Sequence, residues 1–230
     1  MPTRLIVDEQ NQLQQVGTSK QYGYPAFVTV AAKVFSIIFH PIFIPVYLSW
    51  FLVYQHQFLF SGFSEWDKTK LMLQFFVMYT FFPVVTTLLL KALGFIKSIF
   101  LKTQRDRIIP YVVSGIYYFW VWYVLRNQLQ FPKEIVSFSL AAFIASSIGL
   151  IANIYLKISM HAIAVGVMCT FMALLAFTDS SNITLYVIIA FLITGIVCSA
   201  RLLVSDHNQR EVYIGLFIGV ISQVIANYFA

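Results

Sequence analysis

Ionisable side chains gather in one short stretch of this chain, CSARLLVSDHNQREVYIG at 198–215. Five of them fall within eleven positions, although charged residues make up only 10% of the protein: Arg201, Asp206, His207, Arg210 and Glu211. His207 and Glu211 are four residues apart, so on a helical turn they share one face. A carboxylate that holds one imidazole nitrogen fixes the tautomer and leaves the other nitrogen free to attack phosphorus. The spacing therefore predicts a histidine nucleophile for covalent phosphoryl transfer, with Asp206 as the helix N-cap.

Two other stretches carry groups that suit the same chemistry, KTQRDRIIP at 102–110 and KISMH at 157–161. His161 can protonate the departing alkoxide as a general acid. Basic side chains, and hydroxyl and amide groups at a helix start, can hold phosphate oxygens and stabilise charge as it develops. The candidate phosphate ligands are Lys102, Arg105, Arg107, Ser159 and Arg201. This chemistry requires no metal ion and no cofactor, and the two cysteines form no CxxC metal spacing.

Long apolar runs separate these stretches and must position them. The chain of 230 residues is 60% hydrophobic and has a mean hydropathy of +0.80, which is typical of an integral membrane protein. A membrane-spanning helix needs about 20 apolar residues. Windows of that length fall at 27–54, 71–95, 109–126, 135–156, 161–178, 183–203 and 212–230. We therefore predict an all-α polytopic membrane protein, a multi-pass bundle of about six to seven transmembrane helices.

Some parts of this layout are less regular. The first window is overlong and interrupted by Pro41 and Pro45, which predicts a kink or a re-entrant segment. It also contains His40, either a neutral ring bonded to a nearby carbonyl or part of a site. The window at 109–126 is short and aromatic and could lie partly in the membrane interface. Residues 1–24 are predicted to be a polar tail without a cleaved signal peptide, and residues 25–230 a single transmembrane domain.

Two apolar windows separate each chemical stretch from the next, so all three are expected at the same side of the membrane. That side then carries the whole net charge of +6, because the acidic and basic residues assigned to the other side cancel. The positive-inside rule indicates that the basic side is cytoplasmic and the protein lies in the cell (inner) membrane. Converging Arg and Lys side chains also suit a phosphate site. Both interpretations stay open.

The order and spacing of these residues form three motifs. Arg201, five residues, His207, three residues and Glu211 make up the last one. Ser159 and His161 belong to the second, in which Ile158 and Met160 are the other two positions. In the first motif, Lys102 and Pro110 stand eight residues apart, with Ile109 before the proline.

Together these motifs resemble KxxxxxxRP, PSGH and SRxxxxxHxxxD of the type-2 phosphatidic acid phosphatase superfamily, the membrane relatives of vanadium haloperoxidases. The resemblance covers roughly 102–211 and implies a divergent member with a phosphatase-like core at about 92–230. It implies His207 as nucleophile, Glu211 as its orienting partner and His161 as general acid. It also implies Lys102 and Arg201 as phosphate ligands, with Arg105 or Arg107 substituting for the arginine that Ile109 replaces.

Two functions follow as hypotheses. The first is a metal-independent, multi-pass membrane phosphatase that hydrolyses a lipid phosphate or pyrophosphate through a phosphohistidine. The alternative is a non-enzymatic protein, a pseudoenzyme, that binds or translocates an anionic lipid or small anion; Ile109 and Met160 at positions where the family has Arg and Gly favour it. The expected partners are membrane lipids, including a phosphorylated lipid substrate, and not nucleic acid.

Overall fold

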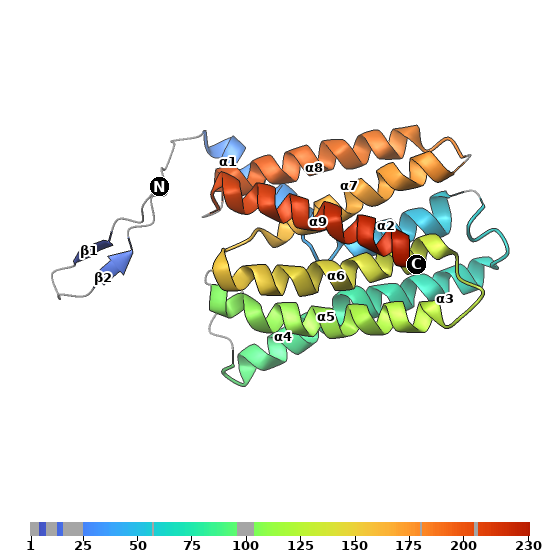
Figure 1. Ribbon diagram of the computed structural model, residues 1–230, viewed down its shortest axis with the longest axis horizontal. Coiled ribbons are helices and arrows are strands. Elements are labelled where there is room, and N and C mark those ends of the chain that lie inside the picture. The colour runs from blue at the N-terminus through green and yellow to red at the C-terminus, as the bar shows by residue number, and fades with distance from the viewer. Residues whose placement is uncertain are drawn as a thin grey trace.

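The computed structural model describes residues 5–7, 13–15, 25–56, 58–95, 104–179, 181–204 and 207–230. Its long helices run side by side in one bundle (Figure 1). The helical elements are α1 (Ala26–Ile38), α2 (Ile44–Trp50), the π-helix η1 (Phe51–Gln55), α3 (Glu65–Phe76), the π-helix η2 (Val77–Phe81), α4 (Phe82–Ala92), α5 (Gln104–Arg126), α6 (Lys133–Tyr155), α7 (Met160–Thr178), α8 (Thr184–Val204) and α9 (Gln209–Phe229). Two short strands, β1 (Leu5–Val7) and β2 (Leu13–Gln15), pair antiparallel with Leu5 opposite Gln15.

Within the described residues, six helices are long and apolar enough to cross a membrane, judged by length and composition. They are Glu65–Ala92, Asp106–Arg126, Lys133–Tyr155, Met160–Thr178, Thr184–Val204 and Gln209–Phe229. The prediction of an all-α polytopic bundle is confirmed. The aromatic window at 109–126 belongs to a full-length helix, α5, which contains Pro110.

The first apolar window forms a broken segment. The apolar helix α1 has 13 residues, too few to span alone, and α2 follows after a break at 39–43. Pro41 lies in that break and Pro45 in the first turn of α2, where its missing N–H costs no hydrogen bond. The break is tied to the next span, because the Thr80 hydroxyl donates to the carbonyl of Ile42 at 2.9 Å. The kink expected from the two prolines is present.

Glycines bring α7 and α9 close together, and this contact aligns two of the predicted motifs. A Cβ at Gly166 would lie 2.5 Å from the carbonyl oxygen of Leu216, and one at Gly215 would lie 2.9 Å from that of Ser159. Small residues at such positions let membrane helices approach with their backbones nearly touching. The start of α9 is thereby fixed beside the start of α7.

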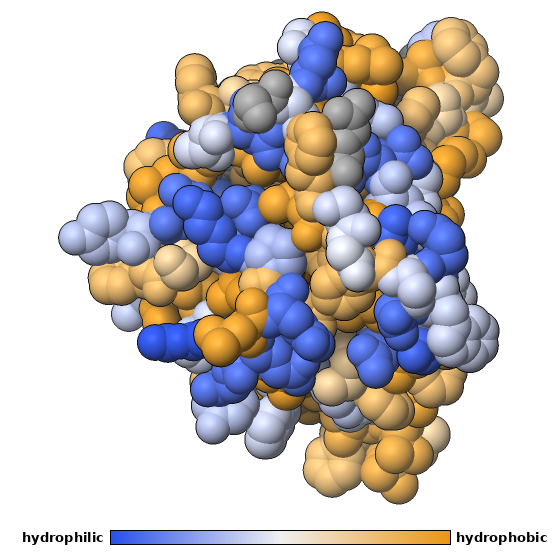
Figure 2. Space-filling view, turned by 90° about the vertical axis from the view of Figure 1, so that its right-hand side faces the viewer, coloured by the Kyte–Doolittle hydropathy of each residue, from blue (hydrophilic) through white to orange (hydrophobic). Residues whose placement is uncertain are grey.

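The two ends of the bundle carry different helix termini and different polar side chains. At one end, on the left in Figure 1, lie the start of α5, the ends of α6 and α8, and the start of α9. This is the arrangement that the alternation of spans predicted for the three motifs. Figure 2 shows the other end, where hydrophilic side chains gather across the middle and hydrophobic ones surround them. That second end carries two ion pairs on α3, Lys68 with Glu65 and Lys70 with Asp67.

Candidate functional site

The start of α9 places Glu211 against His207. Asn208 caps this helix and accepts a hydrogen bond from the Glu211 amide at 2.9 Å, while the Glu211 carboxylate accepts from the Asn208 amide at 3.2 Å. This reciprocal capping box fixes the carboxylate beside the residue before the cap. The same carboxylate oxygen, Oε2, lies 2.8 Å from Nδ1 of His207. The expectation that Asp206 caps α9 is wrong, because the helix begins two residues later than that cap requires.

The contacts of His207 define its tautomer. A carboxylate accepts, so Nδ1 carries the proton and Nε2 presents its lone pair. That lone pair faces Nη2 of Arg107 at 3.4 Å, and both residues are buried, His207 with 8% and Arg107 with 7% of its surface exposed. Arg107 is itself held by a 2.7 Å hydrogen bond from Nη1 to the carbonyl of Ile158. A phosphate oxygen that reached this guanidinium would lie next to a nucleophilic nitrogen.

The surroundings keep His207 neutral. Burial lowers the pKa of His207, Glu211 raises it, and the charges of Arg107 and Arg201 lower it, so that the pKa lies below its ordinary value. An uncharged ring with one nitrogen held by a carboxylate is the form that attacks phosphorus. The basic residues therefore have two effects, since they attract an anion and keep the neighbouring ring unprotonated.

Arg107 is the arginine that contacts His207, as expected for one member of the Arg105 and Arg107 pair. The side chain of Arg105, and the whole of Lys102, lie outside the described residues, as does Asp206. The predicted ligand Arg201 stands in the last turn of α8, half-buried, and its charge acts on His207.

Ser159 connects the starts of α7 and α9. It is fully buried, its hydroxyl oxygen accepts a 3.4 Å hydrogen bond from the Ala162 amide as the cap of α7, and its own amide donates to the Glu211 carbonyl at 3.2 Å. The hydroxyl predicted to bind phosphate thus caps a helix. Ser159 still helps to fix Glu211, because the hydrogen bond from its backbone amide to the Glu211 carbonyl joins the backbones of the two motifs.

His161 faces α1. Its Nε2 donates to the carbonyl of Ser36 at 3.0 Å, and its ring meets that of His40 edge to face, with centroids 5.1 Å apart. The charge of Arg201 acts on both rings, and that of His207 on His161. A neutral His161 therefore has its proton on Nε2, and a proton for a leaving group must be carried on Nδ1.

No protein-family model matches this chain, and neither a curated protein nor a solved structure matches it. The site therefore has to be interpreted from its own residues. Direct contacts join His207, Glu211 and Arg107, and electrostatic interactions connect His207 to Arg201 and to His161. Within the described part of the chain, no group of three His, Cys, Asp or Glu side chains could hold a metal ion.

Three residues that hold the site together, Asn208, Ile158 and Ser36, were not among the site residues predicted from the sequence. Asn208 could have been recognised, because Asn followed three residues later by Glu is a capping signature. The carbonyls of Ile158 and Ser36 could not have been recognised, since every residue has a backbone carbonyl. Only the packing of the helices brings that of Ile158 to Arg107 and that of Ser36 to His161. His40, whose role the sequence left open, lies against His161 because the helix breaks at that point.

Proposed function

We propose that this chain is a multi-pass membrane phosphatase that hydrolyses a lipid phosphate or pyrophosphate through a phosphohistidine on His207. One observation carries the proposal: the buried ring of His207 is held at Nδ1 by Glu211 and turns Nε2 toward the guanidinium of Arg107. The pKa of the ring lies below its ordinary value, so the nucleophilic form predominates at neutral pH. The resemblance to the type-2 phosphatidic acid phosphatase superfamily, as a divergent member, agrees with these roles.

The reaction has two steps that balance. In the first, the Nε2 lone pair of His207 forms a bond to phosphorus and the bond from phosphorus to the lipid oxygen breaks. The lipid alkoxide takes the Nδ1 proton of a doubly protonated His161, whose Nε2 proton stays on the Ser36 carbonyl. Arg107 and Arg201 stabilise the charge on the transferring group. In the second step, water gives a proton to Nδ1 of His161 and attacks phosphorus, the P–N bond breaks, inorganic phosphate leaves and His207 regains its Nε2 lone pair. Glu211 stabilises the positive charge on the ring between the two steps.

The location of the site supports a lipid substrate. Arg107 is in the first turn of α5 and His207 directly precedes α9, so both lie at one end of a bundle of helices long and apolar enough to cross a membrane, the end at which lipid headgroups would meet the protein. A phosphorylated headgroup reaches this end without leaving the bilayer. The excess of Lys and Arg at the same end supports a cell (inner) membrane location with the site on the cytoplasmic side.

The test is phosphate release by purified protein in the presence of a metal chelator. Candidate substrates are phosphatidic acid, phosphatidylglycerol phosphate, polyprenyl pyrophosphate and a lipid A phosphate. We expect release from at least one of them, and none from His207→Ala. The matched control is His56→Ala, which removes a buried histidine from the opposite end of the bundle and should retain turnover. Folded protein that releases phosphate from none of the four would refute the proposal.

A second candidate is a non-enzymatic protein that binds or translocates an anionic lipid or small anion. Two contacts favour it: Nε2 of His161 is committed to the carbonyl of Ser36, and Nε2 of His207 is covered by Arg107. In that case the double variant His207→Ala, His161→Ala keeps its affinity for phosphatidic acid, and neither form turns the lipid over. The phosphatase proposal instead requires turnover that the double variant lacks.

A further inference from the structure

A groove runs along the outside of the bundle between α1 and α8. It encloses about 580 Å³, and its lining is apolar apart from Ser199. Buried alanines, Ala32 on α1 and Ala200 on α8, form the floor, while exposed phenylalanines of both helices form the rims. Gly195 leaves the middle open, because a Cβ built there would meet no atom within 4 Å.

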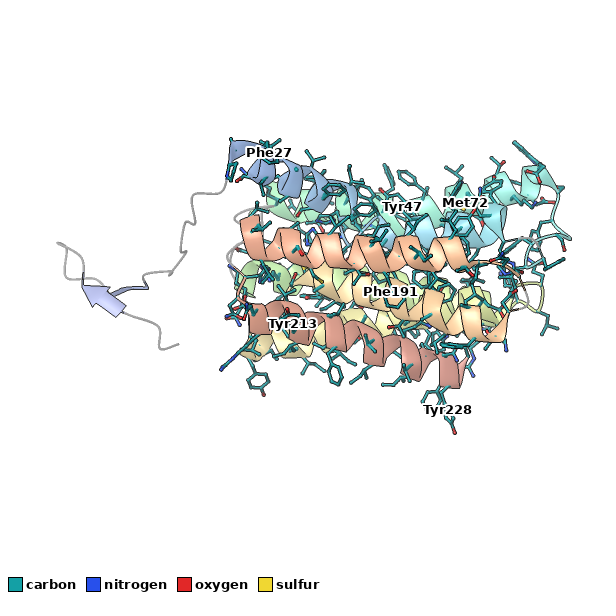
Figure 3. The ribbon with its side chains drawn as sticks, turned by 90° about the horizontal axis from the view of Figure 1, so that it is seen from above. Phe27, Tyr47, Met72, Phe191, Tyr213 and Tyr228 are labelled. Carbon is teal, nitrogen blue, oxygen red and sulfur yellow. The ribbon has the colours of Figure 1, made fainter. Side chains whose placement is uncertain are left out.

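The groove has the length of one leaflet. Its lining on α8 extends from Phe191 to Leu203, a separation of twelve residues along the helix or about 18 Å. Half of the hydrocarbon core of a bilayer measures about 15 Å. Figure 3 labels Phe27, at one end of the bundle, and Phe191, about midway along it, and both line the groove. A single lipid chain that lay in the groove would therefore run from one membrane surface to the bilayer centre.

The shallow end of the groove lies at the same end of the bundle as the proposed site, because α8 ends and α9 starts there (Figure 1). Leu203 lines the groove, Val204 ends α8, and His207 follows three residues later. Arg201 stands between two lining residues, Ala200 and Leu203. A cationic end of the bundle that suits phosphate, next to an apolar groove one leaflet long, matches the charged headgroup and apolar chain of a phosphorylated lipid.

We propose that the groove between α1 and α8 binds one acyl chain of the phosphorylated lipid whose headgroup lies at His207, and that Gly195 keeps the groove open for that chain. The inference rests on the proposed function for the identity of the headgroup, but it concerns binding rather than turnover. In a bilayer, the surrounding lipid is as apolar as the groove, so the preference for this chain comes from its packing and from the headgroup that anchors it.

The test uses phosphatidic acid with a photoreactive group at the end of one acyl chain, in the His207→Ala background, so that no turnover occurs. The comparison lipid is the diacylglycerol with the same chain. We expect phosphatidic acid to label α1 and α8 at the deep end of the groove, and diacylglycerol to label them far less. Gly195→Phe should lower this labelling about ten-fold, because the phenyl ring occupies the path of the chain. Ser199→Phe, one turn away, provides a second blocking variant.

Leu185→Phe is the matched control, since Leu185 is an exposed residue of α8 that does not line the groove. It should leave the labelling unchanged. The proposed role of the groove would be refuted if labelling by phosphatidic acid persisted in both Gly195→Phe and Ser199→Phe, or if diacylglycerol labelled the groove equally well. That conclusion would hold even if the native chain hydrolyses lipid phosphate. If both variants reduce the labelling but the native chain releases no phosphate from any lipid, the groove would be supported and the phosphatase proposal refuted.

Discussion

Glu211→Gln separates the structural role of Glu211 from its chemical role. Glutamine also serves at the third position of a capping box, so its carbonyl oxygen can accept from the Asn208 amide as the carboxylate does at 3.2 Å. Two further contributions are lost: the interaction of a negative charge with the helix N-terminus, about 0.3–1 kcal/mol, and the exposed 3.2 Å hydrogen bond that Glu211 Oε1 accepts from the Asn208 side chain. We therefore expect the variant to fold and to bind lipid.

The expected effect on turnover is far larger. The carboxylate that holds Nδ1 of His207 at 2.8 Å also stabilises the positive ring of the phosphohistidine, and an amide does so poorly. Loss of an orienting carboxylate of this kind lowers kcat by about 100-fold to 10,000-fold. The assay is phosphate release from the best lipid substrate, with Arg210→Gln, an exposed neighbour, as the matched control.

The pH dependence adds a readout that a structural role alone would not change. Because Glu211 raises the pKa of His207, its removal lowers that pKa further. Protonation of His207 abolishes the nucleophile, so the acidic limb of the rate profile should move to lower pH in Glu211→Gln. In the native chain this limb should already lie below about 6.5, the ordinary pKa of histidine. Turnover within two-fold of the native chain and an unmoved limb would refute the role given to Glu211.

Three further predictions concern neighbouring groups. Arg107→Lys should raise KM for the lipid about ten-fold, because an ammonium cannot hold the Ile158 carbonyl and face His207 together, whereas Arg105→Lys should change KM little; equal effects would indicate a diffuse basic patch. Vanadate, which can adopt the geometry of a transferring phosphoryl group, should inhibit turnover and raise the thermal midpoint, and His207→Ala should abolish that rise. Asp179→Ala should lower the free energy of unfolding by about 1–3 kcal/mol, since it leaves buried His56 without the carboxylate now 2.6 Å from its Nε2, yet turnover should remain; unchanged stability in thermal denaturation would contradict this.

The sequence was sufficient for the parts of the fold and site that depend on local spacing. Apolar length predicts the spans, and four-residue spacing predicts that Glu211 reaches His207. The contact survives although His207 precedes α9, because the capping box turns the chain back toward Glu211.

Contacts between distant segments could not be predicted in this way. The choice of Arg107 depends on how α5 is rotated against the loop at 156–159, and no local pattern encodes that rotation. His161 meets Ser36 across 125 positions of sequence because α1 breaks where it does. The groove at Gly195 exists for the same reason, since it depends on which face of α8 the short helix α1 covers.

The phosphohistidine is the central claim, and covalent labelling tests it most directly. The native chain is exposed briefly to phosphatidic acid labelled at phosphorus, denatured and digested. We predict an acid-labile, base-stable label on the peptide that contains His207, and none in His207→Ala. Turnover by the native chain without such a label, together with full activity of His207→Ala, would contradict the account.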